Sequence, residues 1–287
     1  MRTRPVRREL LKERLNALVA TFDVSTITPD PLQLVLRYEG PEDQEIAALL
    51  AAAFAYGRAD IVVANIGRVL ERMGPSPHLS LMAFDRDEAV ERFAGFSHRF
   101  QKTPELVALL ERLAAAVRQY GTIGRLFESC YDADDEDIGP SLTRFVAALI
   151  NIVPPSHVER AALDYLLTSP ANGSACKRMN LFLRWMVRRT SPDLGLWRFA
   201  DPSKLVMPLD THVHRIASFL GLNRRKSADW KTARQLTDRL AVFDAGDPVR
   251  YDFAICRLGI LDLCSRKRRK EQCDVCMVRD VCRFPCP

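Results

Sequence analysis

The last 24 residues constrain the chain most, because four cysteines stand there at a spacing typical of metal ligands. Cys264, Cys273, Cys276 and Cys282 form the pattern C-x8-C-x2-C-x5-C. A Cys-x2-Cys pair supplies two thiolates from a single tight turn, and two further sulfurs complete a four-thiolate site. Such a site suits an iron–sulfur cluster or zinc. Cys286 is an alternative to Cys282 as the last ligand.

A run of five basic residues lies between the first two of these cysteines. The run consists of Arg266, Lys267, Arg268, Arg269 and Lys270. A loop held at both ends by a metal centre can meet phosphate groups at a low ordering cost. The net charge of +6 also favours an anionic partner, and nucleic acid is the commonest such partner of a basic soluble protein. The alternative is a basic surface without a specific partner.

The composition is that of a globular protein in a reducing compartment. The 287 residues are 47% hydrophobic and 27% charged, enough for one large domain or two lobes with a core. No apolar stretch approaches the roughly 18 residues of a membrane span. Residues 5–21 are expected to form a basic amphipathic helix rather than a signal peptide. Five of the eight cysteines crowd into the tail, which fits a cytoplasmic metal protein better than a secreted disulfide framework.

The hydrophobic periodicity predicts an all-α fold. Apolar residues recur at three- and four-residue spacing, and no alternating run of β-branched residues indicates a strand. The acidic segment Asp132–Asp137 is expected to be a solvated loop. The predicted helices are Gln44–Phe54, Ile61–Met73, Glu105–Tyr120, Ile123–Tyr131, Leu142–Ile152, Ala175–Arg189, Thr211–Leu220, Trp230–Phe243 and Pro248–Leu263.

Three motifs stand in a characteristic order along the chain. The first is Ser169-Pro-Ala-Asn-Gly173, followed by Lys177 and Asn180; the second is Leu-Asp210-Thr-His-Val-His-Arg; the third is the four-cysteine tail. This order resembles the helix-hairpin-helix DNA glycosylases of the endonuclease III type, and within them an uncharacterised bacterial branch. That branch is indicated by the runs at 174–188 and 247–254.

The resemblance implies a fold, a cofactor and an activity. The fold would be two helical lobes with a cleft between them. Residues 41–200 would form a helical barrel lobe ending in the hairpin, and residues 1–40 with 201–287 the metal-cluster lobe. The protein would be a monomeric base excision repair enzyme that flips a damaged or mispaired base and hydrolyses its N-glycosidic bond. The tail would hold a [4Fe–4S] cluster, with structural zinc as the alternative. The partner would be duplex or single-stranded DNA, with RNA left open.

The chain departs from the family pattern in three places. The family hairpin is usually Leu-Pro-Gly-Val-Gly, and here one glycine is lost. Eight residues instead of the usual six separate the first two cysteines. An insertion at about Thr190–Lys204, just before the Asp210 motif, is expected to reshape the pocket or to hinder duplex DNA.

Asp210 is the first candidate catalytic residue. Cleavage of an N-glycosidic bond builds positive charge on the sugar, which a carboxylate can stabilise while it orients or deprotonates water. The same aspartate precedes a predicted helix and could cap it, a role compatible with catalysis. His212 and His214 do not favour a second metal site, because positions i and i+2 lie on nearly opposite faces of a helix.

Lys177 is the second candidate. With two extra residues in the hairpin it aligns with the family's lyase lysine, whose amine attacks the sugar and forms a Schiff base. An ungapped alignment places Ala175 there instead, and Lys177 would then contact phosphate or solvent. The expected phosphate contacts are Gly173 in the hairpin, Lys177, Arg178, Arg184, Arg188, Arg189 and the run Arg266–Lys270. Phe54 and Tyr56 are candidates for the wedge that fills the gap left by a flipped base, with core packing as the alternative.

Two other hypotheses compete with the enzyme. The chain could be a nucleic-acid-binding protein that kept the fold and the metal but lost the chemistry, as the altered hairpin and the insertion would favour. It could also be a zinc-stabilised interaction module, which would not bind nucleic acid.

Overall fold

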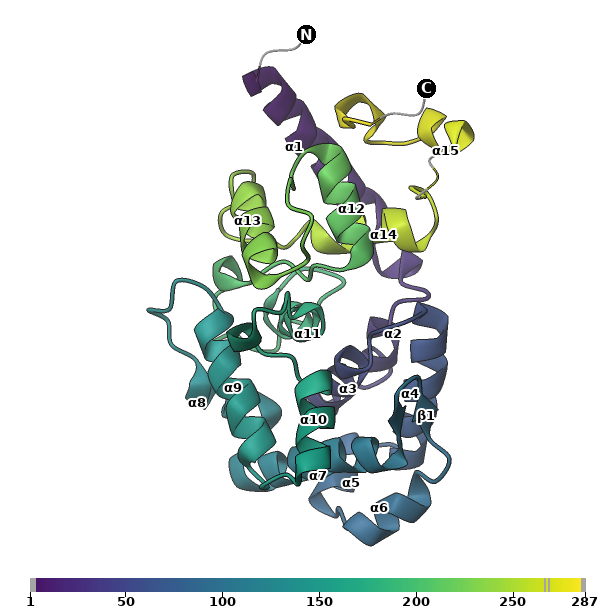
Figure 1. The fold of residues 1–287 in the computed structure, drawn as a ribbon, viewed down its shortest axis with the longest axis vertical. Coiled ribbons are helices and arrows are strands. Elements are labelled where there is room, and N and C mark those ends of the chain that lie inside the picture. The colour runs from purple at the N-terminus through teal and green to yellow at the C-terminus, as the bar shows by residue number, and fades with distance from the viewer. Residues whose placement is uncertain (1–3, 266, 268, 285–287) are drawn as a thin grey trace.

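The fold is predominantly helical. In a computed structural model that describes residues 4–265, 267 and 269–284, the chain forms fifteen α-helices and a two-stranded hairpin (Figure 1). The helices are α1 Arg4–Thr21, α2 Leu32–Val35, α3 Pro41–Ala53, α4 Ala59–Met73, α5 Pro77–Met82, α6 Arg86–Arg92, α7 Thr103–Tyr120, α8 Ile123–Cys130, α9 Gly139–Asn151, α10 His157–Leu166, α11 Lys177–Val187, α12 Thr211–Leu220, α13 Trp230–Ala241, α14 Asp252–Ile260 and α15 Lys270–Asp274. The strands are β1 Ser97–His98 and β2 Gln101–Lys102.

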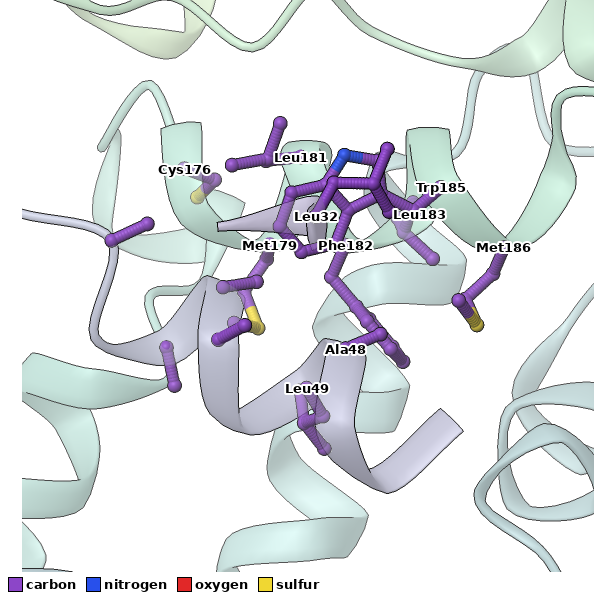
Figure 2. Packing of buried hydrophobic residues seen from close by; sticks show 14 of the residues in the cluster. Leu32, Ala48, Leu49, Cys176, Met179, Leu181, Phe182, Leu183, Trp185 and Met186 are labelled. Carbon is purple, nitrogen blue, oxygen red and sulfur yellow. The ribbon is translucent and has the colours of Figure 1, made fainter. Parts of the chain in front are cut away.

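Helix α11 runs through the middle of the molecule. Residues 178–187 of this helix are all buried, so it has no solvent face of its own. Met179 and Phe182 pack toward Ala48 and Leu49 of α3 (Figure 2). Because α11 begins at Lys177, the same packing fixes the position of the candidate lysine.

Helix α12 shows how the sequence sets the ends of an element. Asp210 caps its first turn, and Gly221 ends it in the left-handed conformation with φ +78°. The buried residues recur at three- and four-residue spacing, and this stripe packs against α14. They are Val213, Ile216, Ala217 and Leu220.

The two ends of the chain meet on one side of α11. Helices α1, α12, α13 and α14 and the cysteine tail gather at one end of the molecule, whereas α5, α6 and α7 form the other (Figure 1). Leu11, Leu15 and Leu18 of α1 are buried in the same hydrophobic core as Val281 of the tail. Arg14 pairs with Asp280 at 2.9 Å, which adds a polar contact between the two termini.

The insertion at 190–204 folds back onto α11. The backbone N–H groups of Leu194 and Trp197 donate to the carbonyls of Trp185 and Met186. Trp197 is 2% exposed, and its indole N–H donates to the carboxylate of Glu45 at 2.7 Å. The insertion is thus part of the core rather than a free loop.

No helix in the described part of the chain is long and apolar enough to cross a membrane.

Candidate functional site

A cavity of about 380 Å³ brings the two candidate catalytic residues together. It lies where the first residues of α4, the start of α11, the start of α12 and one face of α14 meet. Lys177 and Asp210 both line it. None of residues 190–204 is among the described residues that line it, so the insertion bears on this pocket only through Asp193, which contacts the lining residue Arg184.

Asp210 has both of its carboxylate oxygens engaged. Its Oδ1 accepts from the backbone N–H of Val213 at 2.7 Å, the geometry of a helix N-cap. Its Oδ2 accepts from the thiol of Cys256 at 3.5 Å. The predicted cap is therefore confirmed, and the carboxylate is held in a fixed orientation while it faces the cavity.

Lys177 is placed by the segment that precedes it. Ser169 caps a short 3-10 turn, Gly173 adopts φ +71°, and Cys176 adopts φ +48° immediately before α11 begins. The Lys177 amine donates to the carbonyl of Ala55 at 3.1 Å, from the loop after α3. This contact holds the amine against the cavity wall.

Gly173 has protein partners for both of its backbone polar groups. Its N–H donates to Pro170 at 2.9 Å, and its carbonyl accepts from Trp230 at 3.1 Å. Ser174 also forms a bridge with Asp229. The loop before α13 thus braces the hairpin, and Gly173 serves the turn instead of offering a free amide to phosphate.

Asp252 is a second buried carboxylate at the cavity. It is 2% exposed, lines the cavity from α14, and binds the guanidinium of Arg184. Burial raises the pKa of Asp252 to about 6, against the opposing effect of Arg184, and the nearby charge of Asp210 raises it further. Asp252 was not among the residues proposed from the sequence, although an aspartate four positions before Cys256 in an apolar helix is a usable signal.

The Asp252–Arg184 pair continues as a chain of buried ion pairs. Arg184 also contacts Asp193 of the insertion at 3.1 Å, and Asp193 in turn binds Arg188. Arg188 then contacts Asp247 at 2.9 Å. Arg184 and Arg188 are 2% and 3% exposed, so the prediction that they contact phosphate is wrong. Their charges are neutralised by aspartates inside the protein.

Arg178 is also interior, which corrects its assignment as a DNA contact. It is 9% exposed and donates to the carbonyls of Ala53 and Tyr165. Its guanidinium lies between the rings of Tyr56 and Tyr165, at 5.1 and 4.8 Å from their centroids. Burial lowers the pKa of Arg178. The residue therefore ties α11 to the loop after α3.

The wedge candidates divide in the structure. Phe54 is fully buried, so the core alternative holds for this residue. Tyr56 is half-buried in the stack with Arg178 and Tyr165. Phe100, at the turn between β1 and β2, is an aromatic side chain of this cluster that reaches solvent; it is 70% exposed and in edge contact with Tyr165. The Arg99 side chain beside it lies close to Gly57, which lines the cavity.

His212 packs closely against α14. A methyl group at Gly259 would lie 2.2 Å from His212 Nδ1, so only glycine lets the ring sit there. His212 lines the cavity and His214 does not, among the residues that the structure describes. The two side chains thus lie on different sides of α12, in line with their i and i+2 positions.

The four cysteines of the tail line one small, largely apolar cavity of about 30 Å³ beside the end of α12. Burial raises the pKa of the Cys264 thiol to about 11, Arg215 opposes this, and the other three thiols add to it. The carbonyl of Cys264 accepts from Arg215 at 2.6 Å. Among the described residues, however, no three His, Cys, Asp or Glu side chains are arranged to hold a metal ion.

The basic run of the tail is described in part. Lys267, Arg269 and Lys270 are exposed, and Arg269 pairs with Asp262 at 2.7 Å. Arg266, Arg268 and Cys286 lie outside the described residues.

Comparison with known proteins defines a family. No curated protein and no solved structure matches the chain. Residues 30–261 match a family described as "Protein of unknown function (DUF2400)". The match contains the cavity residues Lys177, Asp210 and Asp252 and ends just before Cys264. The chain belongs to this family.

Proposed function

We propose that the protein is a DNA glycosylase-like enzyme of base excision repair, related to the helix-hairpin-helix glycosylases. The observation that carries the proposal is the shared cavity of Asp210 and Lys177, residues from two motifs that stand far apart in the sequence. A carboxylate and an amine facing one pocket form a pair suited to attack at a sugar carbon. The proposed two-lobe division, 41–200 against 1–40 with 201–287, would place this cavity at the lobe boundary.

Asp210 is the group that would act on the sugar. As the bond between the sugar C1′ and the base nitrogen breaks, positive charge develops on the sugar and the carboxylate stabilises it. Water then forms the new C1′–O bond, gives up a proton toward the carboxylate, and the base leaves carrying a proton. The fixed orientation of the Asp210 carboxylate supports this role, because a preorganised charge needs no rearrangement during the reaction.

Lys177 would supply the strand-nicking activity. Its amine would attack C1′, displace the base and, after opening of the sugar ring, form a Schiff base. The contact between the amine and Ala55 places the nitrogen on the cavity wall, and no described carboxylate forms an ion pair with it. Borohydride reduction would trap this intermediate as a covalent adduct, which Lys177→Gln should abolish.

The tail would support nucleic-acid binding through a metal centre. Four thiols around one apolar cavity are a donor set of the kind that [4Fe–4S] clusters and structural zinc use. Cys264, Cys273, Cys276 and Cys282 would hold the group, whose contribution when bound is to fix the loop that carries Lys267 and Lys270. These exposed cations would then meet the phosphate backbone.

The competing proposal is a binding protein without the reaction. Asp210 already serves as a helix cap, and the hairpin glycine has its backbone groups occupied, so both motifs also have structural uses. A panel of duplexes and single strands that carry uracil, oxidised, alkylated and abasic residues separates the two proposals. Release of a free base supports the enzyme. Salt-sensitive binding without release from any substrate supports the binding protein, and the absence of binding favours a zinc-stabilised interaction module.

A further inference from the structure

At the end of the molecule distant from α6, four arginines have no ion pair with a described carboxylate. Several arginines of this region are neutralised by ion pairs, as in Arg14–Asp280, Arg225–Asp229 and Arg250–Asp244. By contrast, no described carboxylate forms an ion pair with any member of a second group, the arginine patch. The patch consists of Arg7, Arg224, Arg239 and Arg283.

The side chains of two patch members contact Gly221 and Leu222, the two residues that follow α12. The backbone N–H of Arg283 donates to Phe219 at 2.7 Å, and its side chain lies directly on Gly221. A methyl group at Gly221 would come within 2.0 Å of Arg283 Nε, so glycine is needed for this approach. Arg239 of α13 donates to the carbonyl of Leu222, the next residue, at 2.6 Å.

The other two members, Arg7 and Arg224, lie close to these contacts. Arg7 of α1 donates to the carbonyl of Val281 at 2.6 Å, two residues before Arg283. Arg224 is exposed and stands two residues after Leu222. Burial lowers the pKa of Arg283, and repulsion from the guanidinium groups of Arg7, Arg224 and Arg239 lowers it further, consistent with all three lying near Arg283.

A bound anion would stabilise this cluster of positive charges more than solvent does. Like charges brought together destabilise the fold unless a counter-charge binds. Backbone carbonyls hold Arg7 and Arg239 through one nitrogen each, which leaves their other N–H groups available. The planar guanidinium can then bind phosphate oxygens in a bidentate manner.

A membrane surface is a poorer partner than nucleic acid. A helix that lies on a bilayer needs a free apolar face. Helix α1 buries that face in the protein, because Leu11, Leu15 and Leu18 are 7%, 1% and 0% exposed. Most of the apolar side of α1 is therefore taken up by the protein interior, and Val6, 53% exposed, is too small a surface to hold the helix in a bilayer.

We propose that the arginine patch binds the phosphodiester backbone of nucleic acid at a second place, separate from the cavity. Asp210 and Gly221 stand at opposite ends of α12, which is about 15 Å long at 1.5 Å per residue. A strand that occupies both places must extend several nucleotides beyond the one at the cavity. The proposal adds a contact to the proposed function, but its test measures binding and not base release.

The test compares two double variants in the full-length protein. Arg224→Ser with Arg283→Ser removes the two patch members whose guanidinium groups hold no backbone carbonyl in the described structure. Arg92→Ser with Arg160→Ser removes the same charge from α6 and α10, outside the patch (Figure 1). Fluorescence anisotropy with an undamaged 25-base-pair duplex gives Kd across a range of salt concentrations, and thermal denaturation checks that both variants fold.

The patch variant should bind at least about tenfold more weakly than wild type at 100 mM salt. Its slope of log K against log salt should be shallower by about 1.8, because each phosphate contact contributes roughly 0.9. An unchanged slope would overturn the proposal and leave the arginines as caps of helix carbonyls. An equal loss in the control variant would also overturn it. So would a parallel sedimentation assay in which wild type binds phosphatidylserine vesicles while the duplex is not bound. Patch-dependent binding of this duplex, together with no base release from the lesion panel, would uphold the patch and reject the enzyme.

Discussion

The thiol of Cys256 and the carboxylate of Asp210 lie 3.5 Å apart across the contact between α14 and α12. Since the other oxygen of Asp210 caps α12, the carboxylate joins the two helices at the cavity. One turn before Cys256, Asp252 carries a second carboxylate into the same place.

Asp252 should make folding stability depend on pH in a characteristic direction. Its pKa is about 6 in the folded protein and near 3.8 in the unfolded chain, so the folded state binds the proton more tightly. The contribution of Asp252 to the free energy of unfolding is therefore complete below about pH 4 and is lost as the pH rises through 6. Since one pKa unit corresponds to about 1.4 kcal/mol, the change is on the order of 3 kcal/mol.

Urea denaturation of wild type and Asp252→Asn at intervals from pH 4 to pH 7 measures this contribution. The free energy of unfolding of wild type minus that of the variant should fall over this range. Asp244→Asn, which removes the partner of Arg250 away from the cavity, is the control and should show no comparable fall. A difference that stays constant or rises with pH would contradict the role assigned to Asp252.

Gly259→Ala should disturb the junction directly. The added methyl group would overlap the His212 ring, and relief requires α12 and α14 to separate. Overpacking of this kind costs about 1–3 kcal/mol. Gly246→Ala is a matched control, because only Asp244 lies within 4 Å of the new methyl, at 3.8 Å. Equal melting temperatures of the two variants would show that α14 is not packed as closely on His212 as the structure has it.

Trp197→Phe should show how the insertion is anchored. The substitution removes the indole N–H that donates to buried Glu45 and leaves that carboxylate with one fewer partner. The expected loss is about 1–3 kcal/mol beyond the change in packing. Trp185→Phe provides the comparison, because the buried Trp185 Nε1 has no hydrogen-bond partner in the described structure. Equal destabilisation by Trp185→Phe and Trp197→Phe in denaturant would show that the bond to Glu45 does not anchor the insertion.

The tail should bind a metal group through its four cysteines. Anaerobically purified protein is expected to contain about four irons per chain and to absorb broadly near ~410 nm, as thiolate-bound clusters do. Cys273→Ser should lower the iron content, whereas Cys130→Ser, remote from the tail, should not. About one zinc and no colour after reconstitution would assign the tail to zinc instead, and the absence of both metals would reject the metal centre.

The sequence predicted the helices better than the charged interior. Thr211–Leu220 was located to the residue, because its apolar stripe and its two caps lie within one segment. Short helices such as Pro77–Met82 and Arg86–Arg92 were missed, since each spans two turns or fewer and shows little periodicity.

The burial of two arginines could not be predicted from local sequence patterns. Arg184 and Arg188 were expected to contact phosphate, a role that needs them at the surface. Their burial depends on Asp252, 68 positions away from Arg184, and on Asp193 in the insertion. Likewise the exposed Phe100 was not identified, because its position depends on how the six-residue hairpin 97–102 turns. Asp210 and Lys177 were proposed because each belongs to a motif, and both line the cavity.

The most direct test of the central claim is the release of free base by wild type and by Asp210→Asn from the same lesion panel. Asparagine also caps helices, so the variant should fold and should still bind DNA. Wild type should release at least one base, and the variant should do so at least about 100-fold more slowly. Equal rates in the two proteins, or no release by wild type from any substrate that it binds, would contradict the account.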